Sequence, residues 1–339
     1  MLVGPGLGRA IRRIHWVTWL GVAMIVLPLL SLAPYLASGI ELARARNSLV
    51  VDGSIDAADH WSASDSPRDF LVDRAPAHPM FVEVAKRLQL AELPTDWDRA
   101  VAISRHLLGS APTLRDGPIQ SDLRTTYQRI TVNGDGYCVD FVQTFSAIAT
   151  AAGMPMRSWA FSFDGFGGDG HILPEIWNRQ AGVWQLLDVF NNAYFTIAGK
   201  PLSACDFRAA MLSGRGTMQM HKLDPAARPG YLYEDKAWAY YQRGLPEWYL
   251  WWGNNPFDYE HSWSIRTLSP LSRSLAQLGG MVQGVQPHID VLVTADDRKK
   301  IEALWRERLQ LFGVLASVVV GMIIVVVRAA AWRRNGNTP

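Results

Sequence analysis

The chain has 339 residues, of which 49% are hydrophobic and 19% are charged, so it is apolar beside soluble proteins, which have about 25% charged residues. Lys and Arg number 33 against 31 Asp and Glu, and this near balance argues against a nucleic-acid binder, which needs a clustered basic surface. The two cysteines exclude a disulfide scaffold and any zinc or iron–sulfur site built from several cysteines.

The first predicted element is a membrane-spanning helix. No charged side chain lies between Arg13 and Glu41, and roughly 20 apolar residues are enough to cross a hydrocarbon core of about 30 Å. A cleavable signal peptide is the alternative, because Arg9, Arg12 and Arg13 form a basic region before the apolar stretch. The best cleavage site is followed by Pro34, which disfavours cleavage, so we expect a retained anchor.

Two helices are predicted before the first reactive motif. Residues 52–76 are rich in Asp, Ser and Ala, a composition typical of a tether or an irregular lead-in. The apolar pattern then predicts one helix at 79–90 and a second that begins after Thr95. Thr95 can cap this second helix because Asp98 occupies its third position, and residues 116–121 follow later as a loop.

Cys138 stands in the first turn of a predicted helix that follows the glycine turn at 133–136. Phe141 and Phe145 recur at helical spacing, and we expect the helix to stop at Gly153. The positive end of the helix dipole and free backbone N–H groups at this position favour a thiolate. The alternative is a small buried hydrophobic side chain, which is the usual state of a lone cysteine in an apolar helix.

Three strands are predicted after this helix, at 156–163, 171–177 and 183–188. His171 opens the second strand and Asp188 closes the third, so both side chains can converge on the start of the helix. In that arrangement Cys138 attacks a carbonyl, His171 carries the proton and Asp188 orients the imidazole.

These motifs resemble the transglutaminase-like superfamily, a papain-related class, over about residues 95–200. The family pattern is met by Gly-Tyr-Cys at 136–138, Gly-Met-Pro-Met-Arg at 153–157, His-Ile-Leu-Pro-Glu-Ile-Trp at 171–177 and Trp-Gln-Leu-Leu-Asp at 184–188. Thr150, Leu173 and Val189 depart from the family's usual Arg, Trp and Pro but leave the three reactive groups intact. The resemblance implies an α+β fold, a papain-like core with helices on an antiparallel sheet, and a thiol enzyme that forms an acyl-enzyme on Cys138.

Other residues are candidates for supporting roles in the site. Acyl transfer needs a donor to the developing oxyanion; the backbone N–H of Cys138 is the first candidate, and the side-chain amides of Asn133 and Gln128 are others. Glu175 lies on the same strand face as the histidine and could brace it or serve as a structural hydrogen-bond acceptor. Cys205 falls outside the motifs, and we expect a buried thiol. The eight histidines include no close pair, so we expect neither a metal nor an organic cofactor.

Residues 231–263 hold twelve Phe, Tyr or Trp side chains in 33 positions. The segment has three interpretations. It packs as a core onto the catalytic domain, it lies on a membrane surface, where Trp and Tyr are enriched, or it forms a platform for a glycan or peptide.

A second uncharged run at 309–327 is long enough to cross a membrane, and three arginines follow it. Arginines also precede the first span, so both tails are predicted to be cytoplasmic with residues 41–305 outside. Five basic residues between 298 and 308 oppose this orientation. We give more weight to the first span, because its basic residues are distributed more unequally between its two ends.

The predicted organisation is a cytoplasmic tail (1–14), a first span (15–40), an extracytoplasmic lead-in region (41–94), a transglutaminase-like core (95–205), an aromatic-rich extension (206–305), a second span (309–328) and a cytoplasmic tail (329–339). The two spans predict a membrane-anchored protein, and the family resemblance implies a thiol enzyme of a bacterial inner membrane that cleaves or transfers amide or acyl bonds on an extracytoplasmic peptide or envelope polymer. The alternative is a non-catalytic envelope assembly subunit that binds peptide or glycan in the same groove, beside a membrane-protein partner.

Overall fold

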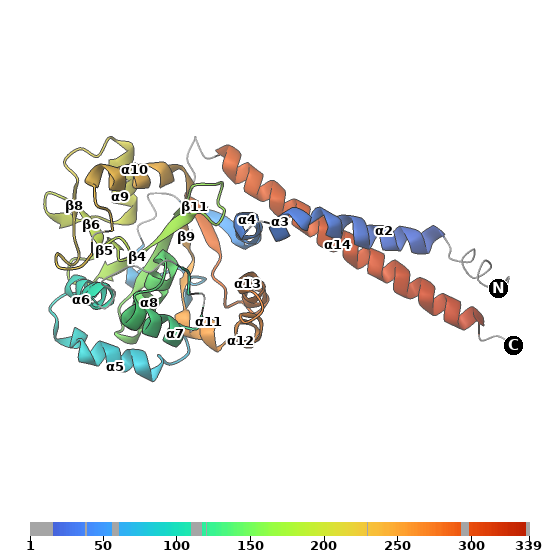
Figure 1. The fold of residues 1–339 in the computed structure, drawn as a ribbon, viewed down its shortest axis with the longest axis horizontal. Helices are drawn as coiled ribbons and strands as arrows, with labels where there is room; N and C mark the ends of the chain where they lie inside the picture. Colours follow the sequence, from blue (N-terminus) through green and yellow to red (C-terminus); the bar gives the residue numbers. More distant parts are fainter. Residues whose placement is uncertain are drawn as a thin grey trace.

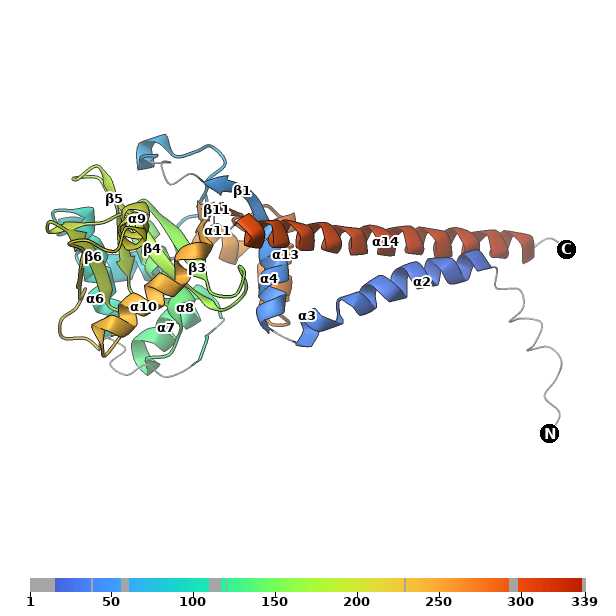
Figure 2. The ribbon, with the colours of Figure 1, turned by 90° about the horizontal axis from the view of Figure 1, so that it is seen from above.

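The computed structural model describes residues 16–37, 39–55, 61–109, 117–119, 121–228, 230–292 and 298–336. A mixed domain of helices and strands lies at one end, and two long helices project from one side of it (Figures 1 and 2). The fold is α+β with an apolar helix near each end of the chain, as predicted.

The domain is built on one large sheet with the strand order β1-β11-β9-β3-β4-β5-β6-β7, and β8 pairs with β6. The strands are β1 (Val51–Ile55), β3 (Met156–Ser162), β4 (Gly170–Asn178), β5 (Val183–Asp188), β6 (Ala193–Ile197), β7 (Lys200–Pro201), β8 (Gln219–His221), β9 (Trp248–Trp251) and β11 (Ile289–Leu292). Only β1 and β11 pair in parallel; the other described pairs of this sheet are antiparallel. A separate small pair joins β2 (Leu71–Val72) and β10 (Gly253–Asn254).

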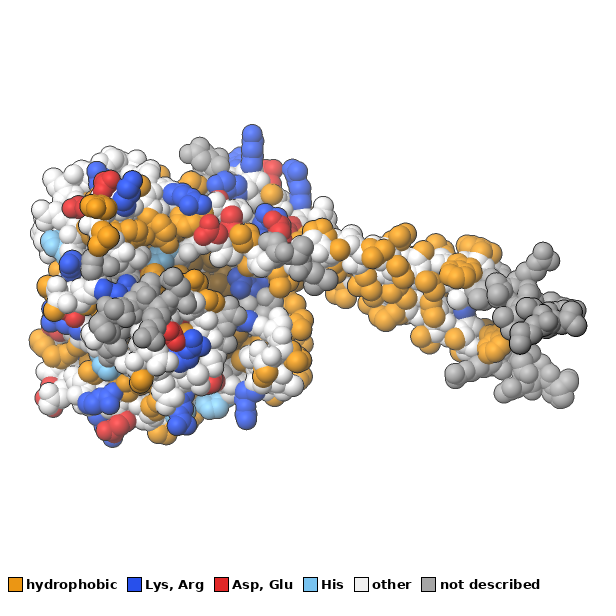
Figure 3. Space-filling model, viewed as in Figure 1, with side chains coloured by type: hydrophobic (Ala, Val, Ile, Leu, Met, Phe, Trp, Pro, Cys, Tyr) orange, Lys and Arg blue, Asp and Glu red, His pale blue; other side chains and the backbone are white. Residues whose placement is uncertain are grey.

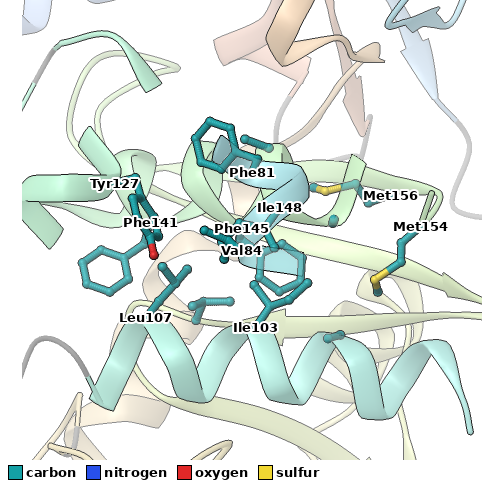
Figure 4. Close-up of a cluster of buried hydrophobic side chains, with 14 of the residues drawn as sticks. Phe81, Val84, Ile103, Leu107, Tyr127, Phe141, Phe145, Ile148, Met154 and Met156 are labelled. Carbon is teal, nitrogen blue, oxygen red and sulfur yellow. The ribbon is translucent and has the colours of Figure 1, made fainter. Parts of the chain in front are cut away.

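Helices cover both faces of the sheet. The α-helices of the described residues are α2 (Trp16–Ser31), α3 (Ala33–Ala37), α4 (Gly39–Val50), α5 (Pro79–Arg87), α6 (Asp96–Gly109), α7 (Leu123–Gln128), α8 (Cys138–Ala151), α9 (Ala204–Leu212), α10 (Glu234–Gly244), α11 (Pro256–His261), α12 (Trp263–Leu268), α13 (Arg273–Val282) and α14 (Arg298–Gly336), of which α2 and α14 project away from the domain. On one face, α5, α6 and α8 bury Phe81, Ile103 and Phe145 in a common cluster (Figure 4). On the other face, α9 and α10 pack Phe207 and Trp238 against the sheet.

The elements predicted from local patterns are present. The helix expected at 79–90 ends at Arg87, because the left-handed backbone of Gln89 (φ 53°) stops it. Helix α6 begins after Thr95, whose hydroxyl oxygen accepts a 3.1 Å hydrogen bond from the backbone N–H of Asp98. The three strands around the proposed site also lie where the sequence predicts them.

The start of the 52–76 stretch is not the tether or irregular lead-in that its composition suggests. Val51 and Ile55 are buried at the two ends of β1, which pairs with β11 at an edge of the large sheet. The strand is short and mostly polar, and its partner lies far away in the sequence, so the local pattern carries no sign of it. The short strand β2 follows within the same stretch.

Most of the aromatic segment is part of the domain core. Strand β9 lies between β3 and β11, and Trp248 is fully buried with its ring stacked on Phe161 at 5.5 Å. Helix α10 packs Trp238 and Tyr241 into the same cluster. Residues beyond 205 therefore contribute to the central sheet rather than forming a separate extension.

The helical stretch Trp16–Tyr35, which comprises α2 and most of α3, and helix α14 are long and apolar enough to cross a membrane. Helices α2 and α14 lie side by side. They pack along one another, and the backbone carbonyl of Met24 accepts a 3.0 Å hydrogen bond from the hydroxyl of Ser317. A Cβ atom on Gly321 would stand 2.6 Å from the carbonyl oxygen of Gly21, so glycines permit this close approach. On the face shown in Figure 3, hydrophobic side chains cover most of the two projecting helices, in contrast with the mixed surface of the domain.

Candidate active site

Cys138 is the first residue of α8 and is partly exposed. The turn before it is held by the carboxylate of Asp140, which accepts hydrogen bonds from the backbone N–H groups of Tyr137 at 2.9 Å and Ile119 at 3.2 Å. Gly136 has φ +110°, a conformation that disfavours residues with a side chain, and a Cβ there would crowd Ile119 at 3.2 Å. This local geometry delivers the thiol to the N-terminal end of the helix.

His171 and Asp188 meet in the buried space beside that helix end. Nε2 of His171 donates a 2.7 Å hydrogen bond to Oδ2 of Asp188, and both side chains are buried. The thiol of Cys138 lies close enough to the imidazole for its charge to raise the pKa of His171. Since Nε2 is bound to Asp188, Nδ1 is the ring nitrogen left for the sulfur. The structure thus brings together the three side chains that the sequence predicts for the site.

The opposite charges of His171 and Asp188 stabilise one another. Burial alone would lower the pKa of His171, but the charges of Asp188 and Cys138 outweigh it and raise the pKa to about 10. Burial would likewise raise the pKa of Asp188, yet the imidazolium and its hydrogen bonds hold that pKa below its usual range. A positively charged imidazole beside an anionic carboxylate is therefore favoured in the folded protein.

Two further residues fix Asp188, and sequence reasoning missed both. The hydroxyl of Tyr241 donates to Oδ2 of Asp188 at 2.6 Å. Asn191 donates its backbone N–H to Oδ1 at 2.9 Å and its side-chain amide to Oδ2 at 2.9 Å. Asn191 lies three residues after Asp188, close enough to be proposed from turn geometry. Tyr241 carries no such signal, because it is one of twelve aromatic residues in its segment.

Aromatic rings enclose the imidazole of His171. The ring centroids of Phe161 and Tyr240 lie 5.6 Å from it, and that of Phe190 lies 6.2 Å away. These rings limit water around the imidazole and restrict its rotation, so they strengthen the interaction with Asp188.

Glu175 has a structural role as a hydrogen-bond acceptor. Its carboxylate accepts hydrogen bonds from Nε of Arg157 at 2.5 Å, from Nε1 of Trp159 at 2.8 Å and from the backbone N–H of Ala204 at 2.7 Å. Arg157 in turn lies over the ring of Trp184 at 4.2 Å. The buried Arg157–Glu175 pair therefore joins two of the sequence motifs and cross-links β3 to β4, and these bonds go to groups other than the histidine.

The two candidate side-chain amides lie at the surface. Gln128 ends α7 and Asn133 ends the π-helical turn that follows it, and both are exposed.

Cys205 is a free, buried thiol on α9, and burial raises its pKa to about 12. Among the described residues, no group of three or more His, Cys, Asp or Glu could hold a metal ion.

A helix-terminal cysteine paired with a buried histidine and aspartate, on helices and an antiparallel sheet, is the arrangement of papain-like thiol enzymes. Residues 83–189 match the transglutaminase-like superfamily. The chain therefore carries a transglutaminase-like domain, of a superfamily whose members are generally cysteine-dependent acyl transferases or peptidases. No curated protein and no solved structure matches the chain.

Proposed function

We propose that this protein is a membrane-anchored thiol enzyme that cleaves or transfers amide or acyl bonds on a peptide or envelope polymer outside the plasma membrane. The observation that carries the proposal is the buried hydrogen bond between His171 and Asp188, with the thiol of Cys138 near enough for its charge to raise the pKa of the imidazole. A histidine held in this way can keep the sulfur anionic and move a proton to and from the reacting groups.

The reaction has two halves. The Cys138 thiolate attacks the carbonyl carbon, a C–S bond forms, and the π electrons move to oxygen. The imidazolium of His171 then gives its proton to the leaving amine as the C–N bond breaks, which leaves an acyl-enzyme. In the second half, water or an acceptor amine loses a proton to His171 and attacks the thioester carbonyl, and the thiolate is released.

The transient oxyanion needs a nearby donor. The backbone N–H of Cys138 belongs to the first turn of α8, where the helix supplies no intrahelical acceptor. It therefore adds to the positive end of the helix dipole where the oxyanion forms. The side-chain amides of Asn133 and Gln128 are further candidates, and both lie exposed in the preceding turns.

The deciding experiment compares alkylation of Cys138 in the full-length protein and in His171→Ala, with iodoacetamide and mass spectrometry. We expect rapid alkylation of wild type near pH 7 and a much slower reaction in His171→Ala. His221→Ala is the matched control, because this histidine lies on β8 and bonds Thr196 at 2.8 Å. The buried thiol of Cys205 should remain unmodified throughout and report that the fold is intact.

Equal rates in wild type and His171→Ala would overturn the pairing of the two residues. That outcome would favour the non-catalytic alternative, in which the region around Cys138 binds a peptide or glycan beside a membrane-protein partner. If the pairing holds, capture of bound polymers with Cys138→Ala is the direct route to the substrate, because this variant binds without turning over.

The proposed topology places the domain between α2 and α14 outside the membrane and the residues before α2 and after α14 in the cytoplasm. The arginines that precede the first span support this orientation. Reporter fusions at Ser66 and Pro339 test it. We expect opposite compartments from the two fusions, and the same compartment from both would reject the two-span topology.

A further inference from the structure

The hairpin formed by α12 and α13 exposes large apolar side chains. Trp263, Leu271, Leu275 and Val282 are 67%, 75%, 48% and 91% exposed. The two helices pack closely on each other, since a Cβ on Gly279 would stand 2.8 Å from Cβ of Ser264, and Ile265 and Ala276 are buried on the inner side of the hairpin. The hairpin is therefore amphipathic, with one side in the domain and one apolar side without a partner in the described chain.

The hairpin lies on the side of the domain from which the two long helices leave. Figures 1 and 2 both place α13 beside α4, at the base of these helices. Helix α13 packs on α4, and Nη1 of Arg46 donates a 2.9 Å hydrogen bond to Oε1 of Gln277. Because α4 follows directly after α2 and α3, this contact holds the hairpin next to the end of the first apolar helix.

The charge pattern of the hairpin fits an anionic lipid surface. No acidic residue occurs between Glu260 and Asp290, whereas Arg266 and Arg273 lie within the hairpin. An apolar side flanked by arginines is typical of a helix that rests in the headgroup region of a bilayer. A tryptophan such as Trp263 is also favoured at this depth.

We propose that the α12–α13 hairpin lies in the surface of the bilayer crossed by α2 and α14, with Leu271, Leu275 and Val282 inserted among the lipids. The proposal rests on the membrane anchoring proposed above. It gives the domain a third membrane contact and fixes its tilt, because α4 and α13 are tied together. A second copy of this chain on the same surface is the competing occupant.

The test uses full-length protein in nanodiscs that contain anionic lipid, in a Cys138→Ala background that avoids labelling of the reactive thiol. An environment-sensitive fluorophore is attached at Val282→Cys on the hairpin, at Val320→Cys on α14, and at Leu232→Cys, an exposed residue before α10. Quenching by lipids with spin-labelled acyl chains is then measured, and Cys138→Ala alone corrects for any label on Cys205.

We expect the labels at 282 and 320 to lose most of their emission and the label at 232 to keep it. Quenching at 320 without quenching at 282 would overturn the hairpin proposal and leave the anchoring intact. An unquenched label at 320 would reject the anchoring itself and the hairpin proposal with it. A label at 282 that is shielded from aqueous iodide but not quenched by lipid would mean that another protein copy covers it, and would also overturn the proposal.

Discussion

Tyr241 donates a 2.6 Å hydrogen bond to the carboxylate oxygen of Asp188 that also binds His171. Burial of Asp188 would raise its pKa, so the carboxylate stays ionised only because several donors surround it. One of those donors comes from α10, well outside the three sequence motifs. The aromatic segment thus supplies both core packing and a polar contact to the candidate site.

Replacement of Tyr241 with Phe keeps the ring but removes the donor. A hydrogen bond to a charged group is worth about 1.5–3 kcal/mol, so we expect the free energy of unfolding to fall by about that amount. Alkylation of Cys138 should also slow, because Asp188 holds the imidazole less firmly. Tyr194→Phe, on a partly exposed tyrosine of β6, is the control. Unchanged stability and unchanged alkylation in Tyr241→Phe would contradict the role assigned to this hydroxyl.

The His171–Asp188 pair should make stability depend on pH. The folded state raises the pKa of His171 to about 10, so the stabilisation is complete below the unfolded value of about 6.5 and is lost as pH rises toward 10. On the acid side, the pKa of Asp188 is lowered, so its share exists above about 3.9 and is lost as pH falls through the folded value.

Melting temperatures of wild type and His171→Gln, measured at pH 5.5 and pH 9.5, check this expectation. The variant keeps a polar side chain but has no titrating group. We expect the difference between the two proteins to be larger at the lower pH. A difference that stays constant between the two values would mean that folding does not raise the pKa of the imidazole.

Replacement of two tryptophans of the aromatic segment should change the free energy of unfolding by very different amounts. Trp248 is fully buried in β9, whereas Trp263 is exposed at the start of α12. Trp248→Ala should lower the free energy of unfolding by about 3–5 kcal/mol, and Trp263→Ala should change it by less than about 0.5 kcal/mol in detergent. Chemical denaturation of the two variants measures both effects, and equal losses would contradict the placement of β9 in the core.

A side chain at Gly321 should disturb the packing of α2 against α14. Gly321→Leu would place atoms against the carbonyl oxygen of Gly21. Cross-linking of Met24→Cys with Ser317→Cys, in a chain without other cysteines, reports the contact, and we expect its yield to fall. Gly313→Leu is the control, because a Cβ there meets no atom within 4 Å. Equal cross-linking in both leucine variants would mean that the helices do not pack at Gly321.

Local patterns were enough to predict the elements around the site. The glycine turn before Cys138 and the alternation of 183–188 are properties of a few neighbouring residues, and the structure has α8 and β5 at those positions. The closeness of His171 and Asp188 followed from the order of the motifs. Their catalytic roles stay predictions.

Contacts between distant parts of the chain could not be predicted in this way. Nothing near Tyr241 indicates that its hydroxyl reaches Asp188, because the bond depends on how α10 crosses the sheet. The position of β9 between β3 and β11 is also set by pairing across the chain, and the abundance of aromatic residues suggested three different environments for it. Only the tertiary packing of the chain shows which of these environments β9 occupies.

The parallel pairing of β1 with β11 also sets an order for biosynthesis. Val51 pairs with Ile289, so a growing chain that has already produced α2 and β1 must wait for nearly the whole domain before this sheet edge closes. Only residues 293–297 separate β11 from α14. Closure of the sheet and arrival of the second long helix beside the first therefore fall at the same stage. A nascent chain halted before β11 would hold β1 as an unpaired edge, and the domain would be complete only as its second long helix is made.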